Sequence, residues 1–333
     1  MRKFNAGAFV ITLTFLLVLS LAAWPVPAFS QAPASAYPQK PVRVLVGLVP
    51  GGNPDTLARL LAAKLGDAFG QQFIVENRPG AGSAVAAEIV AKSPPDGHVL
   101  LVADSGVVTT NPHLFKSLLY DPRDLAPVSL AVVVPMWLVA HPSLPARSAK
   151  ELVVFARTQK HPMPYASSGN GSIHHLTMEA FKADTHVNFA HVPYKGAGQS
   201  VPAMMSGEVA LGFVGYPAAA SAMHSGRLRV LAISTAKRSN LTPQIPTVAE
   251  TVAPGFDMSA PLGVFAAGGT RREIVSRLSQ AVSDAVRVPD VASRMNTIGM
   301  EIAGTTPEQY EKLLRDEYKR LGGLIQRIGM RVD

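Results

Sequence analysis

The sequence predicts an α/β protein of two lobes joined by a hinge, and three observations support this fold class. Short apolar runs alternate with amphipathic helical patterns, as in βαβ units. Two such series are separated by a proline-rich stretch at residues 141–145. The chain has 333 residues, which leaves about 300 after removal of a leader, enough for two hydrophobic cores. We expect each lobe to be a mainly parallel sheet flanked by helices.

The first series follows a proline-rich lead-in. Gly70 is expected to stop the first helix, in which leucines recur at four-residue spacing. Strands are expected at 42–48, 73–76 and 98–103, helices at 54–69 and 82–91, and a turn at 94–97. The predicted first lobe comprises residues 37–140 and 264–333.

In the second series, four strands alternate with three helices, after a helix capped by Ser148. An apolar strand at 263–267 is expected to return the chain to the first lobe, so residues 141–263 form the predicted second lobe and two crossings form the hinge. The strands are expected at 164–167, 188–193, 209–214 and 228–235, and the helices at 173–183, 198–206 and 217–224.

Two C-terminal helices begin with capping-box patterns, Thr270 with Glu273 and Thr306 with Gln309. The last helix is predicted to end near Arg327 and to dock on the first lobe. Its predicted apolar face consists of Tyr310, Leu313, Leu314, Leu321, Leu324 and Ile328.

The N-terminus has the pattern of a cleavable secretory signal: Arg2 and Lys3 precede an apolar run at 6–23. Cleavage is expected after Ser30, with a cut after Ala36 or an uncleaved membrane anchor as alternatives. The chain contains no cysteine and therefore no disulfide. Export without disulfides suggests a bacterial periplasm.

Charge and motifs exclude several classes of function. The net charge of +8 mildly favours small anionic ligands, but the basic residues are scattered and lack the aromatic residues typical of single-strand binding. We therefore expect no nucleic acid partner. No metal site is predicted, because the histidines lack ligand spacing and a cysteine partner. No catalytic residue is predicted either, since G-x-S-x-G and H-E-x-x-H are both absent.

A glycine-rich stretch, Gly80–Val85, resembles the start of a dinucleotide fingerprint, and Asp104 lies about twenty residues beyond. Residues 77–79 separate these glycines from the preceding strand, unlike the fingerprint. A loop lining a cleft is the preferred interpretation, and no cofactor is expected.

The strand-to-helix turns predict an anion-binding cleft. Open α/β sheets bind ligands at the carboxyl ends of their strands, and helix N-termini attract anions. In the turn at 50–55, two glycines allow close approach of a ligand, Asn53 is a possible N-cap, and Asp55 is interpreted as support. Each turn alone is compatible with an ordinary capped helix. The predicted binding residues are Pro50, Gly51, Gly52, Asn53, Asp55, Ser105, Ser168, Gly169, Asn170, Gly171, Ser172, Lys195, Gly196, Gly215 and Tyr216.

Taken in order, these motifs resemble the Bug family, also called TctC-type proteins, the extracytoplasmic solute receptors of tripartite tricarboxylate transporters. The resemblance covers nearly the whole mature chain. It implies a periplasmic-binding-protein fold, type II-like, that closes on a small carboxylate, a di- or tricarboxylate or a related organic acid, and it adds His175 to the site. The motifs are Tyr37-Pro38, Lys40-Pro41, Pro50-Gly51-Gly52 with Asp55, Val75–Gly82, Pro94–Gly97, Tyr120–Pro122, Ala126–Ser129, Gly169–Ser172, His191–Gly196 and Ile245–Glu250.

Departures from the family pattern bear on the ligand. Residues 47–49 are Gly-Leu-Val where Pro-Phe-Ala is common, and Asn53-Pro54 replaces a common Ser-Thr pair. Val214-Gly215 stands where many members carry an Asp-Asn-like pair, which removes an acid that could meet an amino group. This favours acids without an amino group and allows an uncharged or aromatic tail near Tyr216.

The predicted function is therefore a periplasmic, monomeric receptor, not an enzyme, that delivers an organic acid to the membrane subunits of a tripartite tricarboxylate transporter. The alternatives are a secreted α/β enzyme acting on an organic acid, a ligand-sensing receptor for a signalling partner, and an envelope structural protein. An enzyme would need a nucleophile–base pair in the cleft, and the sequence shows none.

Overall fold

The computed structural model describes residues 37–332, and the chain from Pro38 onward forms one compact unit. The predicted signal and both of its cleavage sites lie outside the described residues. Among the described helices, none is both long and apolar enough to cross a membrane.

One sheet of ten strands, in the order β2-β1-β3-β9-β4-β7-β5-β6, forms the centre of the molecule, and β10 and β8 also pair with β4. We call β1, β2, β3 and β10 the first group and β5, β6, β7 and β8 the second group. The strands are β1 Val42–Val46, β2 Phe73–Asn77, β3 Val99–Asp104, β4 Leu125–Ala140, β5 Met163–Ser167, β6 Phe189–Pro193, β7 Leu211–Gly215, β8 Arg229–Ile233, β9 Ser259–Ala267 and β10 Glu301–Ile302.

Parallel pairing dominates within each group. β2, β1 and β3 are parallel, and so are β7, β5 and β6. Parallel strands covered on both faces have continuous apolar runs, which explains why β1 and β3 could be recognised in the sequence. The carboxyl ends of neighbouring parallel strands consequently meet at one edge of each group.

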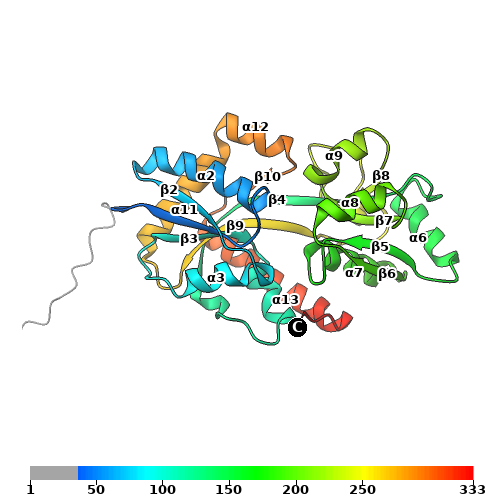
Figure 1. The fold of residues 1–333 in the computed structure, drawn as a ribbon, viewed down its shortest axis with the longest axis horizontal. Helices are drawn as coiled ribbons and strands as arrows, with labels where there is room; N and C mark the ends of the chain where they lie inside the picture. The colour runs from blue at the N-terminus through cyan, green and yellow to red at the C-terminus, as the bar shows by residue number, and fades with distance from the viewer. Residues whose placement is uncertain (1–36, 333) are drawn as a thin grey trace, which may run out of the picture. The chain divides into compact units, whose positions relative to one another are not determined.

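Two antiparallel strands, β4 and β9, run between the groups (Figure 1). β9 pairs with β3 on one side and with the Leu125–Pro135 part of β4 on the other. From Met136 to Ala140, β4 pairs instead with β7 and β8. The sequence prediction contained no strand here, because Pro127 and Pro135 interrupt the apolar run. The register shifts next to Pro127, as expected where proline removes a ladder donor.

The buried Ser234 fastens the two crossing strands where they enter the second group. Its hydroxyl accepts a hydrogen bond from the Met136 amide at 3.0 Å and donates to the Met258 carbonyl. Its backbone bonds the same two residues, at 2.9 Å each. Ser234 therefore joins Met136, which follows Pro135 in β4, to Met258, which immediately precedes β9.

Helices cover both faces of each group (Figure 1). In the first group, α2 and α11 lie on one face, and α3 with the first half of α13 on the other. In the second, α6 and α7 lie opposite α8 and α9. The long helices are α2 Asn53–Phe69, α3 Ala84–Ala91, α6 Ala149–Thr158, α7 Ile173–Thr185, α8 Ala197–Met205, α9 Tyr216–His224, α11 Arg272–Arg287, α12 Pro289–Thr297 and α13 Pro307–Ile328. The short ones are η2 Ala81–Ser83, α4 Gly106–Thr109, α5 Asn111–Leu114, η3 Pro122–Asp124 and α10 Val248–Thr251.

The capping boxes predicted for the two C-terminal helices have different outcomes. Thr306 and Gln309 form the reciprocal hydrogen bonds of a capping box, so that prediction is confirmed. The box at Thr270 is wrong. Helix α11 has Arg271 at its N-cap without a side-chain cap, because the Thr270 hydroxyl donates to the Ala267 carbonyl at 2.7 Å instead.

Helix α13 packs against both groups, whereas the prediction docked it on the first lobe alone. Tyr310 and Leu314 in its first half belong to the core between α3 and β3. Leu324 and Ile325 in its second half belong to the core around Phe181 of α7. The i, i+4 spacing predicted a buried face but could not show that two different cores cover it.

The role of α13 in the second core predicts the effect of shortening Ile325, which is 2% exposed. Ile325→Ala should lower the free energy of unfolding by about 2–5 kcal/mol, because it leaves a cavity in that core. The control is the neighbouring Gln326→Ala on the exposed face of the helix, expected to change stability by less than about 0.5 kcal/mol. Urea denaturation measures both, and equal effects would contradict the assigned packing.

Candidate functional site

A helix follows the carboxyl end of each parallel strand: α2, η2 and α4 in the first group, and α7, α8 and α9 in the second. The N-caps of α2, α8 and α9 are the glycines Gly52, Gly196 and Gly215, and no side chain caps any of these three helices. The first N–H groups of an α-helix have no partner within the helix and attract anions. The two groups therefore present uncapped helix N-termini at the ends of their strands.

In the turn at 50–55, the helix begins one residue earlier than predicted. Gly52 is the N-cap and Asn53 the first helical residue, so the expectation that Asn53 caps α2 is wrong. Pro54 stands at the second helical position. Its ring cannot donate, and this costs nothing where an N–H has no helical partner.

Asp55 holds the turn from inside. Its side chain is buried and accepts hydrogen bonds from the Gly51 amide at 2.9 Å, Arg59 at 3.0 Å and Asn77 at 3.0 Å. Asn77 also donates to the Leu48 carbonyl at 3.0 Å, which ties the other end of the turn to β2. Through these hydrogen bonds, Asp55 links the turn to α2 and β2, which is the supporting role expected of it.

Two opposing effects act on the ionisation of Asp55. Burial disfavours the charged carboxylate, but the hydrogen bonds from Arg59, the Gly51 amide and Asn77 outweigh it, so the pKa of Asp55 lies below its ordinary value. The carboxylate is therefore ionised at neutral pH, and its oxygens are occupied by hydrogen bonds from these donors.

The loop at 167–172 is held by hydroxyl groups. Ser172 caps α7 by accepting from the His175 amide, and its hydroxyl donates to the Gly169 carbonyl at 2.7 Å. The Ser168 hydroxyl lies 2.6 Å from Nδ1 of His174. Gly169 and Gly171 have φ values of +124° and +71°, which residues with a Cβ rarely adopt. Asn170 between them is exposed.

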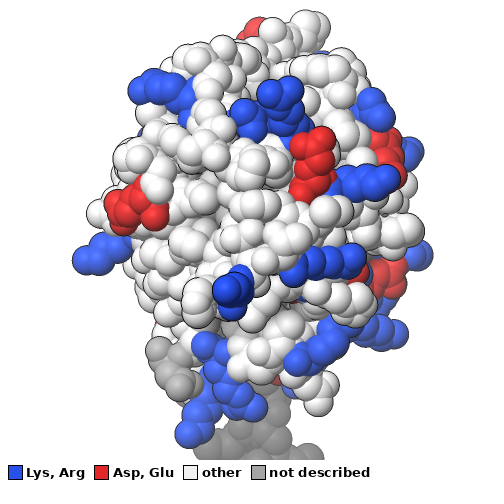
Figure 2. Space-filling model, turned by 90° about the vertical axis from the view of Figure 1, so that its right-hand side faces the viewer, with Lys and Arg blue, Asp and Glu red and all other residues white. Residues whose placement is uncertain are grey.

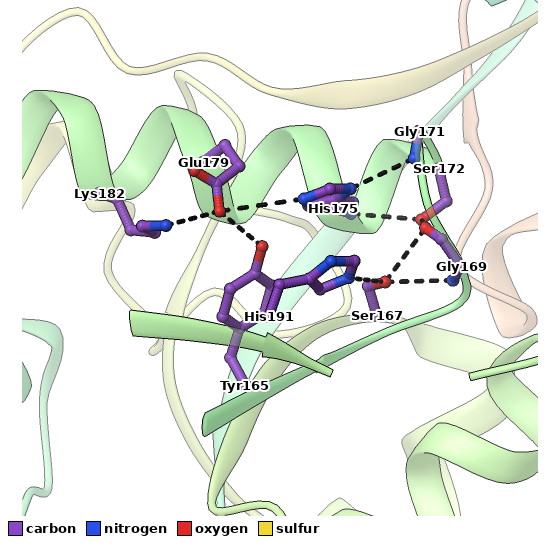
Figure 3. Close-up of polar contacts among 9 residues, drawn as sticks. All are labelled: Tyr165, Ser167, Gly169, Gly171, Ser172, His175, Glu179, Lys182 and His191. Atoms are coloured by element: carbon purple, nitrogen blue, oxygen red, sulfur yellow. Dashed lines mark hydrogen bonds and ion pairs between the residues drawn. The ribbon is translucent and has the colours of Figure 1, made fainter. Parts of the chain in front are cut away.

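Two stacked imidazole rings lie beside this loop (Figure 3). The ring centroids of His175 on α7 and His191 on β6 are 3.6 Å apart, with an interplanar angle of 17°. Nδ1 of His175 accepts from the Gly171 amide at 3.2 Å, and Nε2 of His191 lies 2.6 Å from the Ser167 hydroxyl. The side chain of His175 is 12% exposed. Burial lowers the pKa of His175 to about 4 and also lowers the pKa of His191.

The turns after β6 and β7 are more open. Lys195 is exposed, and its amide donates to the Gln199 side chain at 3.1 Å at the start of α8. A Cβ placed on Gly215 would lie 4.0 Å from Nδ2 of Asn53, so the N-termini of α9 and α2 approach each other across the two groups. Within the second group, a Cβ placed on Gly169 would lie 3.4 Å from the Tyr194 carbonyl oxygen, so the turns after β5 and β6 are also neighbours.

Tyr216 and Ser105 are engaged within the protein. The Tyr216 ring packs on Trp137 at 5.1 Å between centroids, and its hydroxyl meets His224 at 3.2 Å. The buried Ser105 hydroxyl lies 2.9 Å from the Tyr310 hydroxyl and donates to the Pro261 carbonyl at 3.1 Å. Their side chains join neighbouring elements, which is a different environment from that of the exposed Asn170 and Lys195.

Sequence reasoning assigned no role in the site to Arg59, Asn77 or Glu179, and it did not identify His191 as a partner of His175. The i, i+4 spacing of His175 and Glu179 on one helix was a usable signal. The pairing of His191 with Tyr165 across β5 and β6 was not, because it depends on strand register. Within residues 37–332, no group of three or more His, Cys, Asp and Glu residues could hold a metal ion.

On the face shown in Figure 2, Lys and Arg side chains stand among uncharged residues, and acidic side chains lie beside several of them. At the turns, the helix N-termini and the exposed Lys195 provide positive charge, beside the ion pair of Asp55 with Arg59.

Two groups of strands, connected by two crossing strands and with the N-termini of α2 and α9 close together, are the features of two-lobed solute-binding proteins. Residues 57–330 match the model of the tripartite tricarboxylate transporter family receptor, TctC. The chain belongs to this family, and the predicted resemblance is confirmed.

Relatives with known names and structures agree with this assignment. The protein BugT of Bordetella pertussis is 34% identical over 305 residues, covering 90% of this chain and 94% of BugT. Rpa4515 of R. palustris, solved with adipate, has a TM-score of 0.79 and 33% identity, covering 89% of this chain and 99% of that one. MatC of Rhodopseudomonas palustris, solved with bound malate, has a TM-score of 0.75 and 30% identity, covering 87% and 100%. The predicted fold class is thereby confirmed, while the exact lobe boundaries stay a prediction.

The low pKa of His175 predicts how stability depends on pH. Between about pH 6.5 and 4, the unfolded chain binds a proton at this residue that the folded chain does not, so the free energy of unfolding falls as the pH is lowered. The contribution is on the order of 2 kcal/mol between pH 7 and about 4.5.

Urea denaturation of the wild type and of His175→Asn at both pH values measures this contribution. Buried acids such as Glu317, whose pKa is raised to about 8 by burial, act in the opposite sense in both proteins. The variant should therefore lose less stability on acidification than the wild type does. An identical loss in the two proteins would contradict the assignment.

Proposed function

We propose that this chain is a periplasmic receptor that captures a small dicarboxylate between its two groups of strands and delivers it to the membrane subunits of a tripartite tricarboxylate transporter. The observation that carries the proposal is the set of three glycine-capped helix N-termini, Gly52 on one group and Gly196 and Gly215 on the other. Export by the N-terminal signal and action as a monomer are parts of the same proposal.

Backbone groups at these termini suit carboxylates. The N–H groups beyond Gly52 would bind one carboxylate, and those beyond Gly196, with the nearby Lys195, would bind the other. Asn170 on its exposed loop would add a polar contact. Hydrogen bonds to a charged group contribute roughly 1.5–3 kcal/mol each. A few of them supply the approximately 8 kcal/mol that micromolar affinity requires.

Two relatives support the choice of a dicarboxylate, because Rpa4515 was solved with adipate and MatC with malate. Val214 is buried and Gly215 has no side chain, so this turn brings no carboxylate to meet an amino group. An acid without an amino group fits better than an amino acid. The buried ring of Tyr216, packed on Trp137, gives an aromatic tail on the ligand little open apolar surface.

Replacing the N-cap of α2 tests the binding role of its backbone. Gly52 has φ −75° and ψ 170°, which valine adopts readily, and a Cβ there would meet only ordinary contacts at 3.7 Å and beyond. Gly52→Val should therefore fold normally but obstruct the approach of a carboxylate. We expect affinity to fall by about 10- to 100-fold, the equivalent of one or two lost contacts.

Isothermal titration calorimetry with adipate and malate measures this loss. The matched control is Gly323→Val on α13, where a Cβ meets nothing within 4 Å, and it should bind as the wild type does. Undiminished affinity of Gly52→Val would refute the placement of the carboxylate. Failure of the wild type to bind any dicarboxylate would refute the proposed function itself.

A further inference from the structure

The stacked pair His175–His191 is connected by hydrogen bonds to both glycines of the loop at 169–172 (Figure 3). Nδ1 of His175 accepts from the Gly171 amide at 3.2 Å. The Ser167 hydroxyl lies 2.6 Å from Nε2 of His191 and also contacts Gly169, 3.1 Å from its amide and 3.1 Å from its carbonyl oxygen. Each ring thus reaches one of the two residues whose positive φ shapes the loop.

These contacts define the proton positions on both rings. An amide N–H can only donate, so Nδ1 of His175 carries no proton and the neutral ring is protonated on Nε2. Ser167 has one hydroxyl proton. The hydroxyl donates this proton to the Gly169 carbonyl, and its oxygen accepts from the Gly169 amide. When Nε2–H of His191 also donates to the hydroxyl oxygen, all three contacts are satisfied. His191 is then also protonated on Nε2.

We propose that His175 and His191 are positioning residues of the ligand-binding loop: as neutral, Nε2-protonated rings, they hold Gly171 and Gly169 in the conformations that present Asn170 to the ligand. Their role in ligand capture rests on the proposed function, but their effect on the loop does not. Neither ring needs to touch the ligand. The stacking excludes two cations, since charges 3.6 Å apart in a poorly solvated site would repel.

The groups around the pair are consistent with neutral rings. Glu179 on the same helix is 3.9 Å from Nε2 of His175, but it also accepts from the Tyr165 hydroxyl and from Lys182, both at 2.7 Å. His174 turns to Ser168. Strands β7 and β9 carry no ionisable side chain, and Arg327 of α13 pairs with Asp184 near the far end of α7. The nearest negative charge is therefore shared among several donors.

Amide side chains of two lengths separate positioning from packing. Asparagine places its amide group where Nδ1 of a histidine lies, and glutamine reaches the position of Nε2. His175→Asn keeps an acceptor for Gly171, and His175→Gln loses it. At the second ring the order reverses, because His191→Gln keeps a donor for Ser167 and His191→Asn does not. A merely structural role would not give this crossed pattern.

The test uses the ¹⁵N-labelled full mature chain without added ligand, followed by titration with adipate. In the wild type, ¹⁵N shifts should show His175 protonated on Nε2 only, and the Gly171 amide should exchange slowly. His175→Asn and His191→Gln should retain adipate affinity within about threefold. His175→Gln and His191→Asn should lose about tenfold, as expected for one hydrogen bond, and His175→Gln should accelerate Gly171 exchange.

A proton on Nδ1 of His175, or equal effects of asparagine and glutamine at either ring, would overturn the proposal. If the wild type binds neither adipate nor malate, the proposed function fails. The Gly171 exchange rates and the protonation state of His175 then decide the positioning role alone.

Discussion

The antiparallel pairing of β4 with β9 is the constraint on which the remaining structure depends. Each group of parallel strands is connected internally by helices, and within residues 37–332 the ladders that join the groups are those of β4 and β9. Ser234 fixes the point where both strands enter the second group. This pair links the two groups, and its backbone hydrogen bonds, together with the packing of α13 on both groups, hold the turn at Gly52 close to the turn at Gly215.

The candidate site follows a consistent division of labour. Backbone N–H groups at glycine-capped helix starts are available to a ligand, whereas side chains hold the turns that carry them. The Asp55 carboxylate accepts a hydrogen bond from the Gly51 amide, and Nδ1 of His175 accepts one from the Gly171 amide. If a carboxylate binds at these helix starts as proposed, the turns are already held in place, so little ordering entropy would be lost on binding. Recognition by backbone groups would also leave the identity of the acid weakly encoded in side chains.

Much of the fold follows from local patterns, and the failures have identifiable causes. β1, α2 and the strand-to-helix turns were predictable because apolar runs, glycines and prolines mark them within a few residues. β4 was not, since Pro127 and Pro135 interrupt its apolar run. Its pairing with β9 continues past register shifts that the sequence does not reveal. The turn glycines of the candidate site were visible in the sequence. The contact of Asn77 with Asp55 and the stack of His191 on His175 were not, because both depend on which strands become neighbours.

The long path of the chain through the sheet has a consequence for how the protein acquires its structure. β3 lies between β1 and β9, so residues 99–104 cannot complete their pairing until β9, which begins at residue 259, has been synthesised. The core around β3 also contains Tyr310 and Leu314, and the core around Phe181 contains Leu324 and Ile325, all from the last helix. Contacts of such high sequence separation slow folding, because a large loop must close before any of them forms. An emerging N-terminal segment therefore remains without a finished core, and the last helix of the chain completes both halves of the molecule together.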